Sequence, residues 1–600
     1  MTTTQSHFRT SSRLAALLTL SLLYACGGTP TIEPPTSGPI TDTTSEADDR
    51  AAQLELPVSA YAPAFASADA ALVRSDWMSA TAALAALQEI ELERDDADYL
   101  QYMLARVDYR RGQLDAAFSR LEQLEYSTMH PAIAYRLNNF ERHMLSLQGR
   151  HLESARLGVR ALSVAPKSDQ AALKRSIWHA LERSALPELQ RAREQATDAD
   201  WRGWLELAVI DNGSTLALGV ELLNWQANYP EHAAAAPLPG GLEYLLEPTA
   251  APETVALLLP LSGRLAPAGK AVRDGYLASY FHARTEGEAP GQIIVIDSAR
   301  YDSAAEAYRQ AIFQGAQLVV GPLSKHAVAE LAAQAARPVP VVALNRIEQA
   351  ATPAGSALVQ LSLAPEDEAR QLADVAFGQG ARRALVLRPA GVWGDKIEEA
   401  LNARWQALGG TLLPSVSYRD KTEYSAAMKS GLGITASEQR QRRLRDMLAT
   451  TVEFTPRRRQ DIDAVFMLSR TPEEARAIKP LLAFHYAGNL PVYATSNVHG
   501  GGADTRDRDL DGTRILELPW LLGSDPQLQQ ALLRSNGQRF TRLNALGTDA
   551  YKLQSRLRQL QAGPDALISG NTGLMTMNPN LQIERELPAA VFDGDELKPL

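Results

Sequence analysis

Cysteine is almost absent from the 600-residue chain, whose single example is Cys26. With one cysteine, the folded parts of the chain contain no intramolecular disulfide, whichever compartment they occupy. Basic charge is also scarce, since 60 Lys and Arg residues are outnumbered by 70 Asp and Glu residues, giving a formal net charge of −10. No domain has the strongly basic character of nucleic-acid-binding proteins, so we expect no nucleic-acid partner.

Signatures of enzyme active sites are missing as well. The sequence has no His-Glu-x-x-His zinc motif, no Gly-x-Ser-x-Gly nucleophile elbow, no phosphate-binding loop and no Gly-x-Gly-x-x-Gly after a strand. His499 precedes three glycines, as in the oxyanion loop of esterases, but without a nucleophile we interpret this stretch as a flexible loop. The acids at 366–368 fall in the first turn of an expected helix, which carboxylates favour. We therefore expect no catalytic residue, no metal and no cofactor.

The N-terminus carries a targeting signal. Arg9 and Arg13 precede the apolar run Leu14–Leu23, which is shorter than the roughly 20 residues of a transmembrane helix. It has the length of a signal-peptide core. The run ends in Leu-Tyr-Ala-Cys-Gly, which resembles a bacterial lipobox. We predict a lipoprotein signal peptide over residues 1–25 and lipid modification of Cys26.

A tether is expected next. Residues 26–50 are rich in Gly, Thr, Pro, Ser and Asp and have almost no apolar content, which is typical of disorder. Fully extended, this segment would reach about 80 Å. Gly27 and Gly28 follow the cysteine in place of an Asp, and by resemblance to Gram-negative lipoprotein sorting this favours the outer membrane.

Residues 51–232 are rich in Ala, Leu, Arg and Glu and have a helical periodicity. A pattern recurs every 37 residues and precedes an amphipathic helix each time. In it, Ser or Gly is followed five positions later by Ala or Ser: Ser75 and Ala80, Gly112 and Ala117, Gly149 and Ser154. The spacing resembles that of tetratricopeptide repeats, whose period is about 34 residues. An unrelated helical bundle is the alternative. Residues 233–251 are rich in Ala, Pro and Gly, so we interpret them as a linker.

Strand and helix patterns alternate over residues 252–600. Regular alternation predicts parallel sheets covered on both faces, and two successive sets predict a bilobed binding-protein architecture. We expect a closing turn and β-hairpin over Gly570–Phe592. The expected strands are Val255–Leu261, Gln292–Asp297, Leu318–Val320, Val339–Leu344, Ala384–Leu387, Leu412–Tyr418, Ala464–Leu468 and Val492–Ser496.

An Arg-rich stretch at 430–461 interrupts the second set of strands. One hypothesis is a site for an acidic partner such as an anionic glycan or nucleic acid. The other is a solvated surface helix and loop, which is favoured because acidic residues are interspersed among the arginines.

A ligand cleft is possible at the carboxyl ends of the expected strands, where open α/β sheets bind their ligands. Gly, Ser and Asn in these loops suit backbone amides that approach a polar ligand, but they are also ordinary turn and cap residues. Both interpretations stay open. The candidate cleft residues are Ser262, Gly263, Arg264, Gly321, Pro322, Leu323, Asn345, Arg346, Ser362, Trp393, Gly394 and Asp395.

Several segments carry a resemblance to a known family: Trp204–Ala208, Leu257–Gly263, Val319–Leu323, Ala343–Arg346, Leu363–Ala369, Trp393–Asp395 and Ile478–Pro480. Placed in this order after a lipobox and helical repeats, they resemble the penicillin-binding protein activator LpoA family. The resemblance covers nearly all of the chain after the tether. Tyr24 in the lipobox and the Arg-rich stretch depart from the family pattern.

The resemblance implies an outer-membrane lipoprotein that faces the periplasm. Such a protein binds a class A penicillin-binding protein and stimulates its peptidoglycan transpeptidase activity. It has a tetratricopeptide-like N-terminal domain and a C-terminal domain with the type I periplasmic-binding-protein fold. The family supplies no catalytic residue, and only Cys26 matches as a modification site. The alternative is a lipid-anchored receptor that binds an amino acid, a peptide or a wall fragment between its lobes.

Overall fold

The computed structural model describes residues 55–600 except 213–217, 247–251, 288–289, 335, 349–357, 449–452, 527, 531, 533–540 and 564. The expected signal peptide over 1–25, the tether over 26–50 and Cys26 lie outside the described residues. None of the helices in the described part of the chain is both long enough and apolar enough to cross a membrane.

The 37-residue repeat corresponds to three helical hairpins. Ser75, Gly112 and Gly149 lie in the turn of each hairpin with φ of 59°, 80° and 79°, the left-handed conformation that commonly ends a helix. The small residue five positions later is buried in each hairpin, which allows its two helices to pack closely. The hairpins are formed by α1 (Ala62–Val73) with α2 (Trp77–Leu84), α3 (Arg94–Arg110) with α4 (Leu114–Glu122), and α5 (Pro131–Leu147) with α6 (His151–Leu162).

More helices continue this all-α part: α7 (Gln170–Glu182), α8 (Leu186–Gln195), α9 (Ala199–Asp211) and α10 (Leu218–Asn228). Trp204 and Trp225 are buried in their core, and the indole nitrogen of Trp225 donates to the main-chain oxygen of Gly203 at 2.9 Å. The expected linker contains the 3-10 helix η5 (Pro239–Leu245), whose Leu242 is buried in the same core. The division of the chain at 232 and 251 stays a prediction.

The first α/β lobe contains an eight-stranded sheet in the order β12-β13-β14-β5-β4-β3-β1-β2. Strands β1 to β5 and β14 run parallel, and β12 and β13 pair antiparallel. The strands are β1 (Thr254–Leu259), β2 (Gln292–Asp297), β3 (Leu318–Val320), β4 (Val341–Ala343), β5 (Leu358–Leu361), β12 (Ile568–Gly570), β13 (Gly573–Met577) and β14 (Gln582–Glu586).

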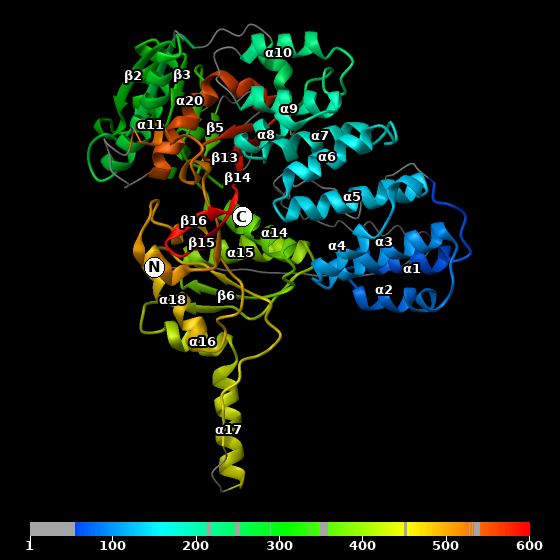
Figure 1. Ribbon diagram of the computed structural model, residues 1–600. Coiled ribbons are helices and arrows are strands. Elements are labelled where there is room, and N and C mark those ends of the chain that lie inside the picture. The colour runs from blue at the N-terminus through cyan, green and yellow to red at the C-terminus, as the bar shows by residue number, and fades with distance from the viewer. Residues whose placement is uncertain are drawn as a thin grey trace, which may run out of the picture. The chain divides into compact units, whose positions relative to one another are not determined.

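Helices cover both faces of this sheet, as the apolar strand pattern predicts. Val255, Leu257 and Leu259 of β1 pack in one core with α11 (Ala266–Thr285) and α20 (Thr541–Gln561), which lie side by side in Figure 1. The alternate residues Ala256 and Leu258 pack on the other face with α12 (Ala304–Phe313) and α13 (Lys325–Ala332). The opening strand is thus buried on both sides.

The second lobe contains a sheet in the order β16-β15-β11-β10-β9-β6-β7, and β8 also pairs with β6. Its strands are β6 (Arg383–Pro389), β7 (Thr411–Leu412), β8 (Val416–Tyr418), β9 (Ala464–Met467), β10 (Val492–Ala494), β11 (Thr513–Leu516), β15 (Ala589–Asp593) and β16 (Glu596–Pro599). Its helices are α14 (Pro365–Gly378), α15 (Val392–Ala407), α16 (Tyr424–Gly431), α17 (Ile434–Leu448) and α18 (Pro472–Phe484).

Two expectations for this half of the chain need correction. The single strand expected over Leu412–Tyr418 is two short strands, because Pro414 between them has no N–H to donate to a ladder. The expected closing hairpin is two antiparallel pairs, one in each sheet: β13 pairs with β14, and β15 pairs with β16. The chain therefore crosses between the lobes after β5, before α20 and after β14, which completes the type I periplasmic-binding-protein architecture.

The all-α part packs directly against the second lobe. Tyr109 of α3 and Phe140 of α5 share one core with Phe377 of α14. Arg382 lies over the ring of Phe377, 3.8 Å from its centroid. Its Nε donates to the main-chain oxygen of Arg110 at 3.0 Å, and its other nitrogens donate to the oxygens of Tyr109 and Phe377. One guanidinium thus caps the C-terminal ends of α3 and α14.

Candidate functional site

The predicted cleft residues of the first lobe follow strands whose carboxyl ends meet at one edge of the sheet. Ser262, Gly263 and Arg264 follow β1 and are exposed. The main-chain N–H of Leu261 donates to the side chain of Asp297, the last residue of β2, at 2.8 Å. This contact fixes the start of the loop and leaves its tip open to solvent.

The loops after β3 and β4 are held to each other. Gly321 and Pro322 are buried, and a side chain at Gly321 would overlap the main-chain oxygen of Leu258. The side-chain amide of Asn345 donates to the oxygen of Leu323 at 2.9 Å. These residues therefore form a fixed rim, in which the Asn side chain is occupied by the neighbouring loop.

Arg346 reaches across to the second lobe. Its two terminal nitrogens contact the two carboxylate oxygens of Asp367, in the first turn of α14, at 3.2 and 3.0 Å. Asp367 is 4% exposed and is also paired with Arg370. Ser362, on the short crossover between β5 and α14, is buried, and its main-chain oxygen accepts from Arg585 at 2.7 Å. The chain's own charges fill this position between the lobes.

The predicted residues of the second lobe lie at the start of α15. Trp393 is partly buried against the core, and Gly394 is buried. Asp395 is exposed and pairs with Arg388 at 2.8 Å. The next residue, Lys396, pairs with Glu348 of the first lobe. The structure therefore places the predicted set at the facing edges of two sheets. It adds Glu348 and Lys396, which the sequence did not single out, and it gives Asp367 a partner across the lobes.

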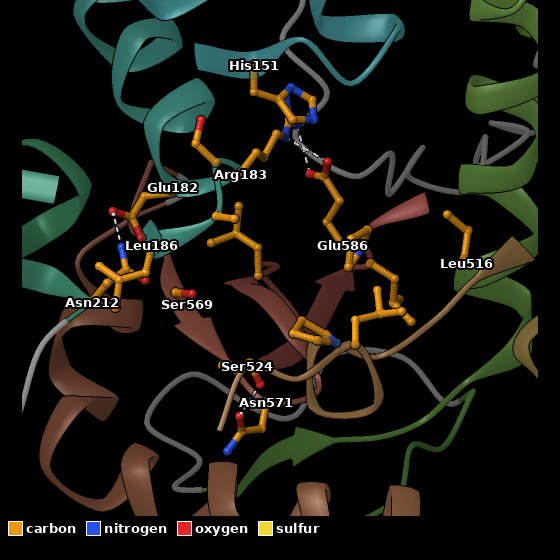
Figure 2. A pocket seen from close by; sticks show the side chains of 18 of the residues that line it. His151, Glu182, Arg183, Leu186, Asn212, Leu516, Ser524, Ser569, Asn571 and Glu586 are labelled. Carbon is orange, nitrogen blue, oxygen red and sulfur yellow. Dashed lines mark hydrogen bonds and ion pairs between the residues drawn. The ribbon is translucent and has the colours of Figure 1, made fainter. Parts of the chain in front are cut away.

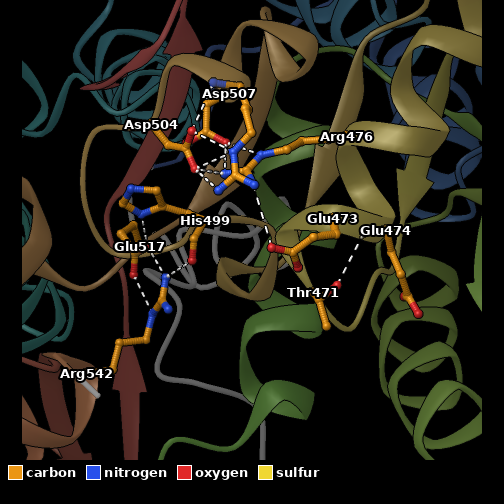
Figure 3. A network of polar contacts seen from close by, with 10 residues as sticks. Thr471, Glu473, Glu474, Arg476, His499, Asp504, Asp507, Glu517 and Arg542 are labelled. Carbon is orange, nitrogen blue, oxygen red and sulfur yellow. Dashed lines mark hydrogen bonds and ion pairs between the residues drawn. The ribbon is translucent and has the colours of Figure 1, made fainter. Parts of the chain in front are cut away.

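A buried charge cluster lies near this position (Figure 3). Glu517 is fully buried, and its carboxylate is 2.7 Å from Nδ1 of His499 and is contacted by Arg542. Burial alone would raise the pKa of Glu517, but the charges of Arg542 and His499 hold it below its ordinary value. His499, which we interpreted as part of a flexible loop, is buried and held by this 2.7 Å contact with Glu517.

Two more polar contacts stabilise this part of the second lobe. Glu368 accepts from the N–H of Ser496 at 2.9 Å and from its hydroxyl at 3.1 Å, and burial raises the pKa of this carboxyl. Figure 3 also shows Arg476 pointing between Asp504 and Asp507, whose carboxylates are 2.9 and 2.7 Å away. The charged groups of this cluster pair with one another or with nearby polar groups. Such mutual pairing is typical of a network that stabilises the fold.

A cavity of about 1750 Å³ lies where the all-α part meets both lobes (Figure 2). Its wall includes His151 and Arg183 from the helices, Ser569 and Glu586 from the first sheet, and Leu516 from the second. Arg183 and Glu586 form an ion pair across it with two contacts, of 2.7 and 2.8 Å. No sequence signal predicted this cavity, because its wall combines residues that are hundreds of positions apart.

None of the predicted cleft residues lines this cavity. Glu182, on its wall, is buried, and burial beside Asp211 raises the pKa of the Glu182 carboxyl well above its ordinary value. Over the described ranges, no group of three or more His, Cys, Asp and Glu side chains is placed to hold a metal ion.

Comparison with known proteins gives relatives over most of the chain. A model of the family described as "LppC putative lipoprotein" matches residues 61–594. The penicillin-binding protein activator LpoA of Vibrio antiquarius is 30% identical over 438 residues, covering 70% of this chain and 72% of the relative. The penicillin-binding protein activator LpoA of Aliivibrio fischeri is 29% identical over 529 residues, covering 86% of this chain and 85% of the relative. The solved structure of full-length LpoA from Haemophilus influenzae is 22% identical with a TM-score of 0.47, covering 92% of this chain and 97% of that one.

Proposed function

Because the chain belongs to the penicillin-binding protein activator LpoA family, we propose that it binds a class A penicillin-binding protein and stimulates its peptidoglycan transpeptidase activity. The observation that carries the proposal is the match of the family model to residues 61–594. The protein would act by contact with the synthase and would perform no chemistry of its own. Its relatives are named as activators.

The pairing of polar side chains between the two lobes favours a protein that contacts the synthase, and it disfavours a receptor for a small solute. A receptor needs polar groups that are available to its ligand. Here Arg346 is paired with Asp367, and Asn345 is bonded to the loop after β3. The names of the relatives do not favour the receptor either. Arg346 would therefore serve to hold the two lobes in one orientation.

The location follows from the N-terminal sequence and the lipoprotein family. Lipid modification of Cys26 would anchor the chain, and several acyl chains on one cysteine anchor it more stably than a single chain does. Gly27 and Gly28 favour the outer membrane, so the folded parts would face the periplasm. The residues between the anchor and the folded parts would let them reach a synthase in the inner membrane.

A transpeptidase assay tests the proposal. The class A synthase of the same cell envelope is incubated with lipid-linked substrate, with and without the full-length lipoprotein in detergent. We expect several-fold more cross-linked product when the lipoprotein is present, and no increase with heat-unfolded lipoprotein as the control. Equal cross-linking with and without folded lipoprotein, at concentrations well above micromolar, would contradict the proposal.

A further inference from the structure

The Arg-rich stretch that the proposed function leaves unexplained forms helix α17, which stands away from the second lobe in Figure 1. Among its described side chains, only Ile434 and Ser437, in its first turn, are buried. No other labelled element lies beside its outer half in Figure 1. A single helix of this length is only marginally stable in water by itself. Its stability therefore depends on its contacts with the lobe at its first turn and on any protein that binds its outer part.

The base of α17 is firmly built into the lobe. Leu432 and Ile434 are part of the core that covers the second sheet. Where the chain returns, the N–H of Arg459 donates to the oxygen of Leu432 at 2.9 Å. Arg459 and Arg383 both contact the carboxylate of Asp461 at 2.7 Å. The helix is therefore a fixed projection, held at both of its connections to the lobe.

The outer end of α17 carries a stripe of exposed apolar side chains. Leu444, Met447 and Leu448 are 52%, 81% and 61% exposed. Their spacing of three and four residues places them on one face of the helix. Adjacent large apolar side chains in water are a mark of interaction sites.

Basic side chains lie along the same face. Arg440 is four residues before Leu444, and Arg443 is four residues before Met447, so each pair lies in one row of the helix. Among the residues that the structure describes, Arg440, Arg442 and Arg443 form no ion pair, while Arg445 pairs with Asp446 at 3.3 Å. The face thus presents apolar anchors next to unneutralised positive charge.

We propose that this face of α17 docks into an apolar groove bordered by acidic side chains on the class A penicillin-binding protein, an inference that rests on the proposed function. Anchors spaced by three and four residues are the pattern of a helix that binds in a protein groove. A helix that lies on a membrane instead carries its apolar face along its whole length. Here the exposed apolar side chains are confined to the outer end, so a protein groove is the better match.

The test measures binding of the full-length lipoprotein to the detergent-solubilised synthase. We expect the double variant L444E/M447E to weaken binding at least tenfold, because two anchors become charged in an apolar groove. The double variant R440E/R443E should also weaken it at least tenfold and should reduce the fall in affinity with added salt. Stimulation of the transpeptidase should fall in parallel.

Matched controls separate docking from folding. Phe313→Glu changes an 84% exposed apolar residue of α12, and R156E/R160E reverses two exposed charges on α6; both should bind within twofold of the wild type. All variants should unfold within about 1 °C of the wild type, because the changed side chains are exposed. A photo-crosslinking amino acid in place of Met447 should capture the synthase, whereas one in place of Phe313 should not.

The two proposals fail in different ways. If the wild type stimulates the synthase and both α17 variants bind and stimulate equally well, the docking proposal is overturned and the proposed function stands. If the wild type itself neither binds nor stimulates, the proposed function fails. Docking is also overturned if, in a Cys26→Ser background, the variants lose binding to phosphatidylglycerol vesicles but keep full affinity for the synthase, since α17 would then contact lipid.

Discussion

Gly112 and Gly380 meet backbone to backbone where the second helical hairpin contacts the second lobe. A Cβ atom on Gly380 would lie 2.7 Å from the main-chain oxygen of Gly112, and one on Gly112 would overlap the oxygen of Gly380. Both glycines have positive φ, of 80° and 94°. The two turns can approach this closely only because neither residue has a side chain.

Gly380→Ala should therefore loosen the contact between the helical hairpins and the lobe. The left-handed backbone costs a non-glycine residue about 1–2 kcal/mol, and the overlap adds roughly 1–3 kcal/mol. Gly315→Ala is the matched control, because Gly315 has φ of 86° and nothing within 4 Å of an added Cβ. Urea unfolding would measure how much each substitution lowers the free energy of unfolding. Equal decreases for the two variants would show that the close approach of Gly112 and Gly380 imposes no extra cost on a side chain.

Arg382→Ala should destabilise the same contact by about 2–3 kcal/mol. The guanidinium donates to main-chain oxygens at the C-terminal ends of two helices and lies against the ring of Phe377. A hydrogen bond that involves a charged group contributes about 1.5–3 kcal/mol to stability. Arg382→Lys should recover less than half of the loss, because an ammonium lacks the planar fork.

Arg383→Ala is the control for that substitution. Arg383 is the next residue, but it is exposed and pairs with the exposed Asp461, an arrangement worth less than about 1 kcal/mol. The comparison requires the free energies of unfolding of the three variants. A similar loss for Arg382→Ala and Arg383→Ala would mean that the capping contacts do not stabilise the docked arrangement.

Glu517→Gln should destabilise the second lobe and reduce its sensitivity to acid. Glu517 is fully buried against Arg542 and His499, and breaking a buried ion pair costs about 3–5 kcal/mol. Because the pKa of Glu517 is lowered in the folded protein, its contribution is complete above the ordinary glutamate pKa of about 4.3. The contribution is lost as the pH falls through the lowered value.

The measurement is the free energy of unfolding of wild type and Glu517→Gln between pH 3 and 7. We expect the difference in free energy of unfolding between the two proteins to be largest near pH 7 and to decrease as the pH falls below about 4. Asp461→Asn is a useful comparison, because Arg459 lowers the pKa of the exposed Asp461 to about 2. A difference in free energy of unfolding that stays constant from pH 3 to 7 would show that the pKa of Glu517 is not lowered in the folded protein.

Local patterns in the sequence predicted the elements that depend on local chemistry. The turn residues Ser75, Gly112 and Gly149 marked the hairpins, because a left-handed turn leaves a recognisable residue at a fixed interval. The apolar run at the start of the first lobe predicted a strand buried on both faces, and the structure confirms it. Pro414 is the local signal for the break between β7 and β8, because proline has no N–H to donate to a ladder.

Contacts between distant segments were not predictable in this way. The ion pair of Arg183 with Glu586 joins residues about four hundred positions apart, and no periodicity carries such information. The sequence suggested Arg346 as a residue of a cleft loop, but it gave no sign that Asp367 would pair with its guanidinium. The helix dipole accounts for an acidic residue at position 367, but the side chain of Asp367 also joins the two lobes.

Arg346→Ala should make the two lobes less firmly held together. The substitution removes a two-contact ion pair to an almost fully buried carboxylate, although Arg370 still contacts Asp367. We expect a loss of about 1–3 kcal/mol, because Asp367 loses one of its charged hydrogen-bonding partners. Lys396→Ala is the matched control, since Lys396 also pairs across the lobes but with Glu348, where both groups are exposed.

The control pair should contribute less than about 1 kcal/mol, so only Arg346→Ala should lower the melting temperature by several degrees. A distance measurement between spin labels on α13 and α15 should also broaden for Arg346→Ala and stay unchanged for Lys396→Ala. If the variant gains affinity for amino acids or wall peptides in a thermal-shift screen, Arg346 and Asp367 had been filling a ligand position. If both variants match the wild type in stability and distance, the ion pair does not hold the lobes together.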